Sequence, residues 1–117
     1  MIGIRLKGGL GNFLFQIASC YSLALDNSAE YAVDLSKIWV VHTEWEEYAD
    51  KIFRNVPIVP KTEGFRSYSY DSLVYKQIPY LENHIFDGYF QCEKYFDHNR
   101  DKVLELFSID EISLTYI

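Results

Sequence analysis

A cluster of glycines between a strand-like and a helix-like segment constrains the fold of this 117-residue chain more than any other feature. Residues Ile2–Leu6 alternate apolar with other side chains, as a strand does, and the segment Gly8–Asn12 interrupts that pattern. Across Leu14–Leu25 apolar residues return every three or four positions, which is typical of a helix packed on a sheet, with Asn12 as its expected N-cap. Tyr31–Asp34 has the pattern of a second strand. This order predicts a βαβ unit with two parallel strands.

The remaining sequence extends the same α/β pattern. Ile85–Phe90 resembles another buried strand, and Tyr95–Phe107 resembles a helix with an apolar face. Between these regions we expect a short apolar run at Ile38–Val41, a helix at Glu44–Phe53 and a short edge strand at Val56–Val59. A loop is expected at Lys61–Ser67, followed by a strand or an exposed arm at Tyr68–Ser72. The sequence therefore predicts one α/β domain over residues 1–117, with a Rossmann-like, mainly parallel sheet and flanking helices.

Composition and charge narrow the class of function. Hydrophobic residues make up 49% of the chain, which is enough for a buried core. The formal charge is −6, so the chain lacks the basic surface that nucleic acids require, and we expect no nucleic-acid partner. Residues 1–25 are the exception, because they carry Arg5 and Lys7 and no acidic residue. We therefore expect the positive charge available to an anion to lie at this end of the chain.

The sequence shows no membrane-spanning, secretory or metal-binding signal. No apolar run approaches the 18 or so residues of a membrane helix, and no signal peptide is evident, so we expect a soluble, cytoplasmic protein. Cys20 and Cys92 have the spacing of neither a metal site nor a disulfide scaffold, and we expect reduced thiols. His42, His84 and His98 are too scattered to form a zinc site.

The glycine segment has the character of an anion-binding loop. A strand that runs into glycines and then a helix leaves unpaired amide hydrogens at the positive end of the helix dipole. A P-loop is excluded because no Gly-Lys-Ser/Thr follows the glycines. The dinucleotide fingerprint is half met, since Gly9 and Gly11 have its first spacing and Asp34 lies where a ribose-binding acid is expected, but Leu14 replaces the third glycine. A nucleotide contact and a purely structural tight turn both remain open.

Two segments together resemble a known enzyme family. Arg5–Asn12, followed by Leu14–Gln16 and Ala18, resembles the opening motif of glycosyltransferase family 11, the alpha-1,2-fucosyltransferases. Gly88–Phe96, which reads Gly-Tyr-Phe-Gln-Cys-Glu-Lys-Tyr-Phe, is similar to that family's second N-terminal motif and lies at about the right distance. The resemblance covers most of the chain and is weakest between residues 39 and 82.

The resemblance implies an inverting, metal-independent transfer of fucose from the donor substrate GDP-fucose to a hydroxyl of a glycan acceptor. It also implies a GT-B-like fold of two Rossmann-like halves, of which this chain would be the N-terminal one. The donor-binding C-terminal half, with its arginine for the departing diphosphate, would then be missing. His98–Asp101 has a superficially similar His-x-Arg pattern, but we expect it to be part of a helix. We therefore expect little or no transfer by the isolated chain.

The candidate site residues follow from the two motifs. The donor-binding candidates are the glycine-loop residues and the preceding arginine: Arg5, Gly8, Gly9, Gly11 and Asn12. The substrate-binding candidates are Gln91, Glu93 and Lys94 from the second motif. Glu93 is also a weak candidate for the catalytic base, against the alternative that Glu93 and Lys94 belong to the ion-paired first turn of a helix.

Two other classes of function remain as alternatives. One is a small NAD-type Rossmann domain that uses Gly9, Gly11 and Asp34. The other is a non-catalytic carbohydrate-binding remnant. For the second, Trp45 among Glu44, Glu46 and Glu47 is either a sugar-binding patch or a solvated helix face.

Overall fold

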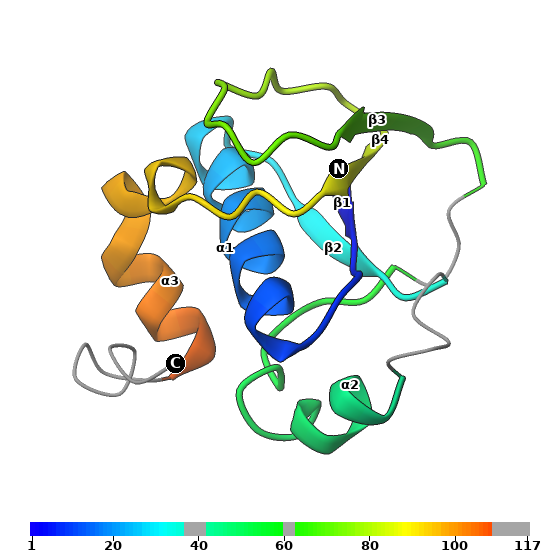
Figure 1. Cartoon of the computed structure of the whole chain (residues 1–117), viewed down its shortest axis with the longest axis vertical. Helices are drawn as coiled ribbons and strands as arrows, with labels where there is room; N and C mark the ends of the chain where they lie inside the picture. Colours follow the sequence, from blue (N-terminus) through cyan, green and yellow to red (C-terminus); the bar gives the residue numbers. More distant parts are fainter. Residues whose placement is uncertain (37–41, 60–62, 109–117) are drawn as a thin grey trace.

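A computed structural model describes residues 1–36, 42–59 and 63–108, and for residues 42–44 it describes the backbone only. The predicted apolar run Ile38–Val41 and the side chains of His42 and Glu44 therefore lie outside the described part. The fold is α/β, a parallel sheet with flanking helices, and this arrangement is compatible with a Rossmann-like domain (Figure 1).

The sheet contains four parallel strands in the order β2-β1-β4-β3. Their bounds are β1 (Ile2–Arg5), β2 (Tyr31–Asp34), β3 (Arg66–Tyr70) and β4 (His84–Gly88). The predicted edge strand at Val56–Val59 is present only as one parallel bridge, in which Val33 donates to Pro57 O at 2.8 Å and accepts from Val59 N at 2.9 Å. Because all strands are parallel, their carboxyl ends meet at one edge of the sheet.

The first helix differs from its predicted start. α1 (Leu10–Asp26) begins two residues before Asn12, and Gly9, with an extended backbone, is the N-cap. The predicted capping role of Asn12 is therefore wrong, because glycine at the cap lets the chain turn into the helix without a side-chain bond. The βαβ unit itself is confirmed, since β1 and β2 pair in parallel with α1 between them.

The later helices are shorter than the sequence pattern predicts. α2 (His42–Tyr48) ends before the predicted limit at Phe53, and turns follow it. The predicted helix after the second motif is broken into two 3-10 turns, η1 (Glu93–Tyr95) and η2 (Asp97–Asn99), and then α3 (Arg100–Phe107). Within the described ranges, no helix combines the length and the apolar character needed to cross a membrane.

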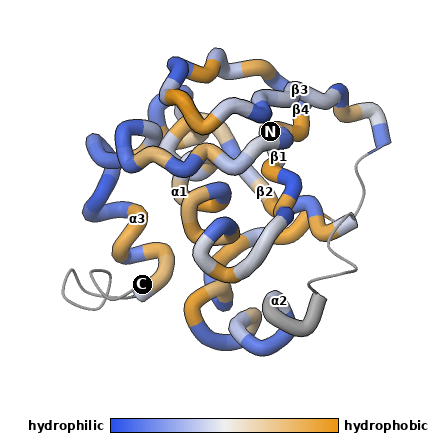
Figure 2. The backbone as a smooth tube through the Cα atoms, viewed as in Figure 1, coloured by the Kyte–Doolittle hydropathy of each residue, from blue (hydrophilic) through white to orange (hydrophobic). Residues whose placement is uncertain are grey.

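One continuous hydrophobic core joins α1 to the sheet and to the outer helices. Phe13 on α1 is fully buried, and its ring lies 6.3 Å from that of Phe53. Phe53 in turn stacks on Trp45 of α2 at 4.7 Å and contacts Phe107 of α3 at 6.2 Å. Figure 2 shows hydrophobic residues along α1, whereas the outer side of α3 is hydrophilic. This packing fixes α1, and with it the glycine loop, against the carboxyl edge of the sheet.

Candidate functional site

The glycine loop lies at the carboxyl end of the central strand β1 and leads directly into α1. Gly8 has φ +84°, a left-handed conformation that a side chain would strain, and a Cβ there would also collide with the Asn12 side chain. Gly11 is exposed, with no heavy atom within 4 Å of where its Cβ would lie. Among the described residues, the backbone N–H groups of Gly9, Gly11 and Asn12 have no hydrogen-bond partner. They are therefore free to meet a ligand.

A buried glutamine holds the base of this loop. Gln16 is fully buried on α1, accepts a hydrogen bond from Lys7 N at 3.2 Å and donates one to Lys7 O at 3.1 Å. The side-chain amide thus pairs with both backbone groups of the residue that links β1 to the loop. Because a fully buried amide would be costly without such partners, the two bonds define where the loop leaves the sheet.

The two cations near the loop are paired with carboxylates, contrary to the expectation from the sequence. Arg5 Nε lies 3.2 Å from Asp34 Oδ2, and Arg5 Nη1 lies 3.3 Å from Asp87 Oδ2. Lys7 Nζ lies 2.8 Å from Asp87 Oδ1 and 3.8 Å from Asp71 Oδ1. These acids are distant in sequence but follow or end the neighbouring strands β2, β3 and β4. The prediction of unopposed positive charge is therefore wrong, since three carboxylates surround two cations.

Asp34, the candidate ribose-binding acid, is not available to a nucleotide in this structure. Its side chain is only 2% exposed. One carboxylate oxygen accepts from Ser36 N at 2.9 Å and the other pairs with Arg5. The first bond closes a turn after β2, which is the capping role that aspartate commonly takes. This geometry does not favour the NAD-type alternative.

The second motif reaches the same edge of the sheet through one residue. Gln91 Nε2 donates a hydrogen bond to Asn12 Oδ1, which links the segment after β4 to the first turn of α1. Tyr89 lies two residues before Gln91, and Lys7 Nζ is 4.8 Å from the centre of the Tyr89 ring. Two candidate residues 79 positions apart, Asn12 and Gln91, are thus in contact.

The other candidates of the second motif lie elsewhere. Glu93 begins η1 and is exposed, and its carboxylate forms no hydrogen bond or ion pair within the part of the chain that the structure describes. The ion pair expected in the alternative interpretation is therefore not observed for Glu93. Lys94 Nζ lies 5.7 Å from the centre of the Tyr75 ring, and Lys94 lines a pocket away from the glycine loop.

Two other sequence features have structural roles. Trp45 is 4% exposed and stacked on Phe53, so it cannot present its face to a sugar. His98 lies 2.7 Å from Asp26 Oδ2, and Asn99 Nδ2 donates to Ser22 Oγ at 2.7 Å, so the His-x-Arg segment fastens η2 to α1. No group of three or more His, Cys, Asp or Glu side chains within residues 1–36, 45–59 and 63–108 is arranged to hold a metal ion.

Sequence reasoning missed three residues of this edge, namely Gln16, Asp71 and Asp87. The signal for Asp87 was partial, because Asp87 lies inside the predicted strand Ile85–Phe90, whereas β4 ends one residue after it, at the edge where the carboxyl ends of parallel strands meet. Gln16 stands out as a polar residue among the apolar positions of α1. Asp71 carried no such signal, since it follows a strand that sequence alone left undecided.

Comparison with protein-family models, with curated proteins and with solved structures gave no match to this chain. The class that the structure itself defines is an α/β domain with a glycine loop at the carboxyl edge of a parallel sheet.

Proposed function

We propose that this chain is the N-terminal, Rossmann-like portion of a GT-B-like glycosyltransferase that transfers fucose from GDP-fucose to a glycan hydroxyl with inversion. The observation that carries the proposal is the hydrogen bond from Gln91 to Asn12. It brings together the two segments that resemble the family's motifs, at the edge where parallel α/β sheets bind their ligands. A purely structural turn at the glycine loop would not require this contact between the motifs.

The free amides at the start of α1 are the proposed donor contact. The N–H groups of Gly9, Gly11 and Asn12 face no partner among the described residues, and the first turn of α1 contains no acidic residue. Both features favour a negatively charged group such as a diphosphate at the positive end of the helix dipole. The exposed Gly11 leaves room for the ligand to approach the backbone closely.

The groups that the transfer reaction needs would come partly from the carboxyl edge of this sheet and partly from the proposed second half of the enzyme. Transfer breaks the bond from the fucose anomeric carbon to the diphosphate oxygen, forms a bond to the acceptor oxygen, and passes the acceptor proton to a base. The leaving GDP needs positive charge, but Arg5 and Lys7 are already paired with Asp34 and Asp87. That charge is proposed to come from the second half. Glu93 stays a candidate base because its carboxylate is exposed and unpaired among the described residues.

A titration of the whole chain, followed by amide NMR shifts, tests the proposal. GDP-fucose and GDP are expected to shift the amides of Gly9, Gly11 and Asn12 and the side-chain amide of Gln91, with an affinity of about 1 mM, since few charges contribute. NAD is expected to produce smaller shifts, because Asp34 is buried. If GDP-fucose leaves these amides unchanged at saturating concentration, or NAD binds more tightly, the proposal is wrong.

A double-mutant cycle tests the hydrogen bond between Gln91 and Asn12, on which the proposal depends. Asn12→Ala and Gln91→Ala are each expected to weaken GDP-fucose binding, and the double variant to be little worse than either single variant, because both remove the same bond. Asn55→Ala is the matched control, since that asparagine is also exposed and belongs neither to the two motifs nor to any other proposed site. Additive losses would show that the two motifs do not act as one site.

A further inference from the structure

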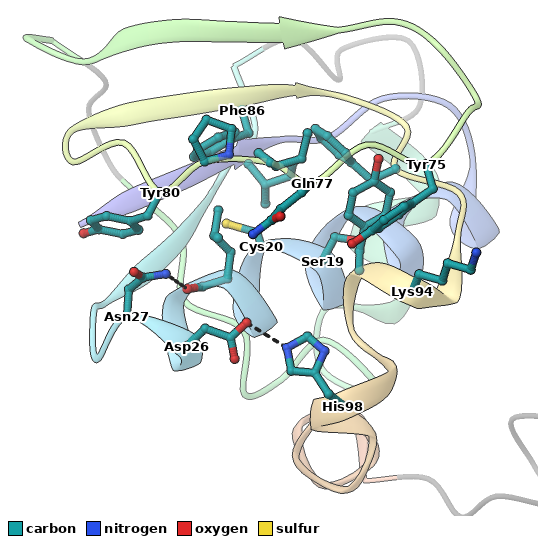
Figure 3. Close-up of a pocket in the computed structure, with 16 residues that line it drawn as sticks. Ser19, Cys20, Asp26, Asn27, Tyr75, Gln77, Tyr80, Phe86, Lys94 and His98 are labelled. Carbon is teal, nitrogen blue, oxygen red and sulfur yellow. Dashed lines mark hydrogen bonds and ion pairs between the residues drawn. The ribbon is translucent and has the colours of Figure 1, made fainter.

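A pocket lies away from the glycine loop and shares none of the loop's residues. It has a volume of about 490 Å³, within the range typical of small-molecule sites. Its walls are the second half of α1, the segment 71–83 that connects β3 to β4, and the residues that follow β4. Figure 3 shows Ser19 and Cys20 on α1 facing Gln77 and Tyr75 of that connecting segment.

A buried hydroxyl without a partner lines this pocket. Ser19 is 8% exposed, and its Oγ makes no hydrogen bond within the described part of the chain. Buried hydroxyls are usually paired, so one that borders an open pocket indicates a polar group of a ligand. The Gln77 side chain also has no hydrogen bond among the described residues and supplies a donor and an acceptor.

The charges around the pocket are largely compensated. Asp26 Oδ2 lies 2.7 Å from His98 Nε2, Asp26 Oδ1 accepts from Asn99 at 3.0 Å, and the charge of Asp26 is formally offset by Lys94, which lines the same pocket. Burial raises the pKa of the Cys20 thiol, which therefore stays neutral. Lys94 is exposed at the edge of the pocket, near the Tyr75 ring. The interior thus offers hydrogen-bonding groups without net charge, which favours an uncharged ligand.

The aromatic side chains restrict the shape of that ligand. The rings of Tyr75 and Tyr95 are 4.8 Å apart and tilted by 50°, so no flat base fits between them. Tyr95 is held in place because its hydroxyl accepts from Lys76 N at 3.1 Å. The remaining aromatic surface suits the apolar face of a ring whose edge carries hydroxyls. A wholly apolar ligand would bury the Ser19 hydroxyl without a partner, which is unfavourable.

We propose that this pocket binds an uncharged sugar of one or two rings, with the Ser19 hydroxyl and the Gln77 amide as hydrogen-bond partners and Tyr75 as the stacking surface. The pocket shares no residue with the glycine loop, so binding at the pocket can be measured separately from binding at the loop.

Amide NMR titration of the whole chain with glucose, galactose, fucose, N-acetylglucosamine and lactose tests this inference. At least one of these sugars is expected to shift Ser19, Cys20 and Gln77 while leaving the loop amides of Gly9 and Gly11 unchanged. The loop amides thereby report separately on the proposed function. No shift at the pocket with any of the five sugars overturns the inference. Three other ligands serve as comparisons: glucose 6-phosphate for an anion, guanosine for a nucleoside base and phenol for an apolar ring. The inference is also overturned if any of them binds the pocket more tightly than the sugars do.

Four variants assign the contacts. Ser19→Ala is expected to weaken binding about five- to tenfold, and it should fold because alanine favours the helix and no bond is lost. Tyr75→Ala is expected to weaken binding about tenfold or more, whereas Tyr75→Phe, which keeps the ring, should bind as the parent does. Ser67→Ala, at an exposed position of β3, is the matched serine control. Unchanged affinity in both Ser19→Ala and Tyr75→Ala would also overturn the inference.

Discussion

Replacing Gly11 by alanine separates the structural role of the glycine loop from its binding role. Gly11 is the second residue of α1, is exposed, and has nothing within 4 Å of where a Cβ would lie. Alanine is favoured over glycine in a helix by about 0.5–1 kcal/mol, and near the first turn we expect the lower value. Gly11→Ala is therefore expected to stabilise the fold, and to raise Tm by about 2–4 °C.

Gly8→Ala provides the contrast on the same loop. Gly8 has φ +84°, and a Cβ there would collide with Asn12, so the variant is expected to lose about 1–2 kcal/mol of stability. Urea unfolding followed by circular dichroism measures both changes. The two glycines thus have opposite predicted effects on stability, although they lie three residues apart.

Binding is expected to respond differently from stability. If a diphosphate approaches the amides at the start of α1, the new methyl group of Gly11→Ala obstructs it, and affinity for GDP-fucose should fall by about fivefold or more. Lys102→Ala is the control, because it also introduces an alanine at an exposed helix position but lies on α3 and not in the glycine loop. A Gly11→Ala variant that is more stable yet binds GDP-fucose as tightly as the parent would refute close approach to the loop. A destabilised variant would refute the helix geometry.

Three further predictions concern buried polar groups. Gln16→Leu is expected to cost about 2–4 kcal/mol in urea unfolding, because it leaves both backbone groups of Lys7 unpaired; Gln16→Glu should recover only part of this loss. Burial raises the pKa of Tyr31, so the stability of the fold is retained below about pH 10, where the unfolded tyrosine begins to ionise, and falls as the pH rises further. Tyr31→Phe should remove this alkaline loss of stability. It should cost almost nothing at pH 7, because the Tyr31 hydroxyl has no partner among the described residues. Iodoacetamide at pH 8 should modify the partly exposed Cys92 and spare the buried Cys20 in the folded protein, and mass spectrometry of digested peptides distinguishes them.

The parts of the fold that local sequence patterns determine were predicted correctly. The alternation in Ile2–Leu6 and the three-to-four spacing in Leu14–Leu25 are direct consequences of strand and helix geometry, and they correspond to β1 and α1. The helix boundary was predicted less well. Asn12 has the chemistry of an N-cap, but in the folded chain its side chain instead accepts from Gln91. A contact between residues distant in sequence thus replaced the local preference.

The electrostatics of the site could not be predicted from the order of charges along the chain. Residues 1–25 contain two cations and no acid, yet both cations lie within 3.3 Å of a carboxylate oxygen. Asp34 and Asp87 approach because β2 and β4 flank β1 in the sheet, and strand order is not encoded in any single segment. The pocket beside Ser19 was missed for the same reason, since its α1 wall is separated in sequence from the other walls by about fifty residues or more.

The paired charges also change how the glycine loop is expected to attract a ligand. Arg5 connects the carboxylates at the ends of β2 and β4, so it braces three neighbouring strands at their carboxyl edge. An anion that drew Arg5 away would leave the buried Asp34 unpaired, and losing one partner of a buried ion pair is costly. The amides of α1 are therefore a less costly contact for a diphosphate than either cation. Because fixed dipoles act only at short range, the affinity for a diphosphate at the loop should depend weakly on salt concentration. If the diphosphate instead bound through Arg5 and Lys7, salt would screen these charges, and the affinity would fall strongly between 50 and 500 mM salt.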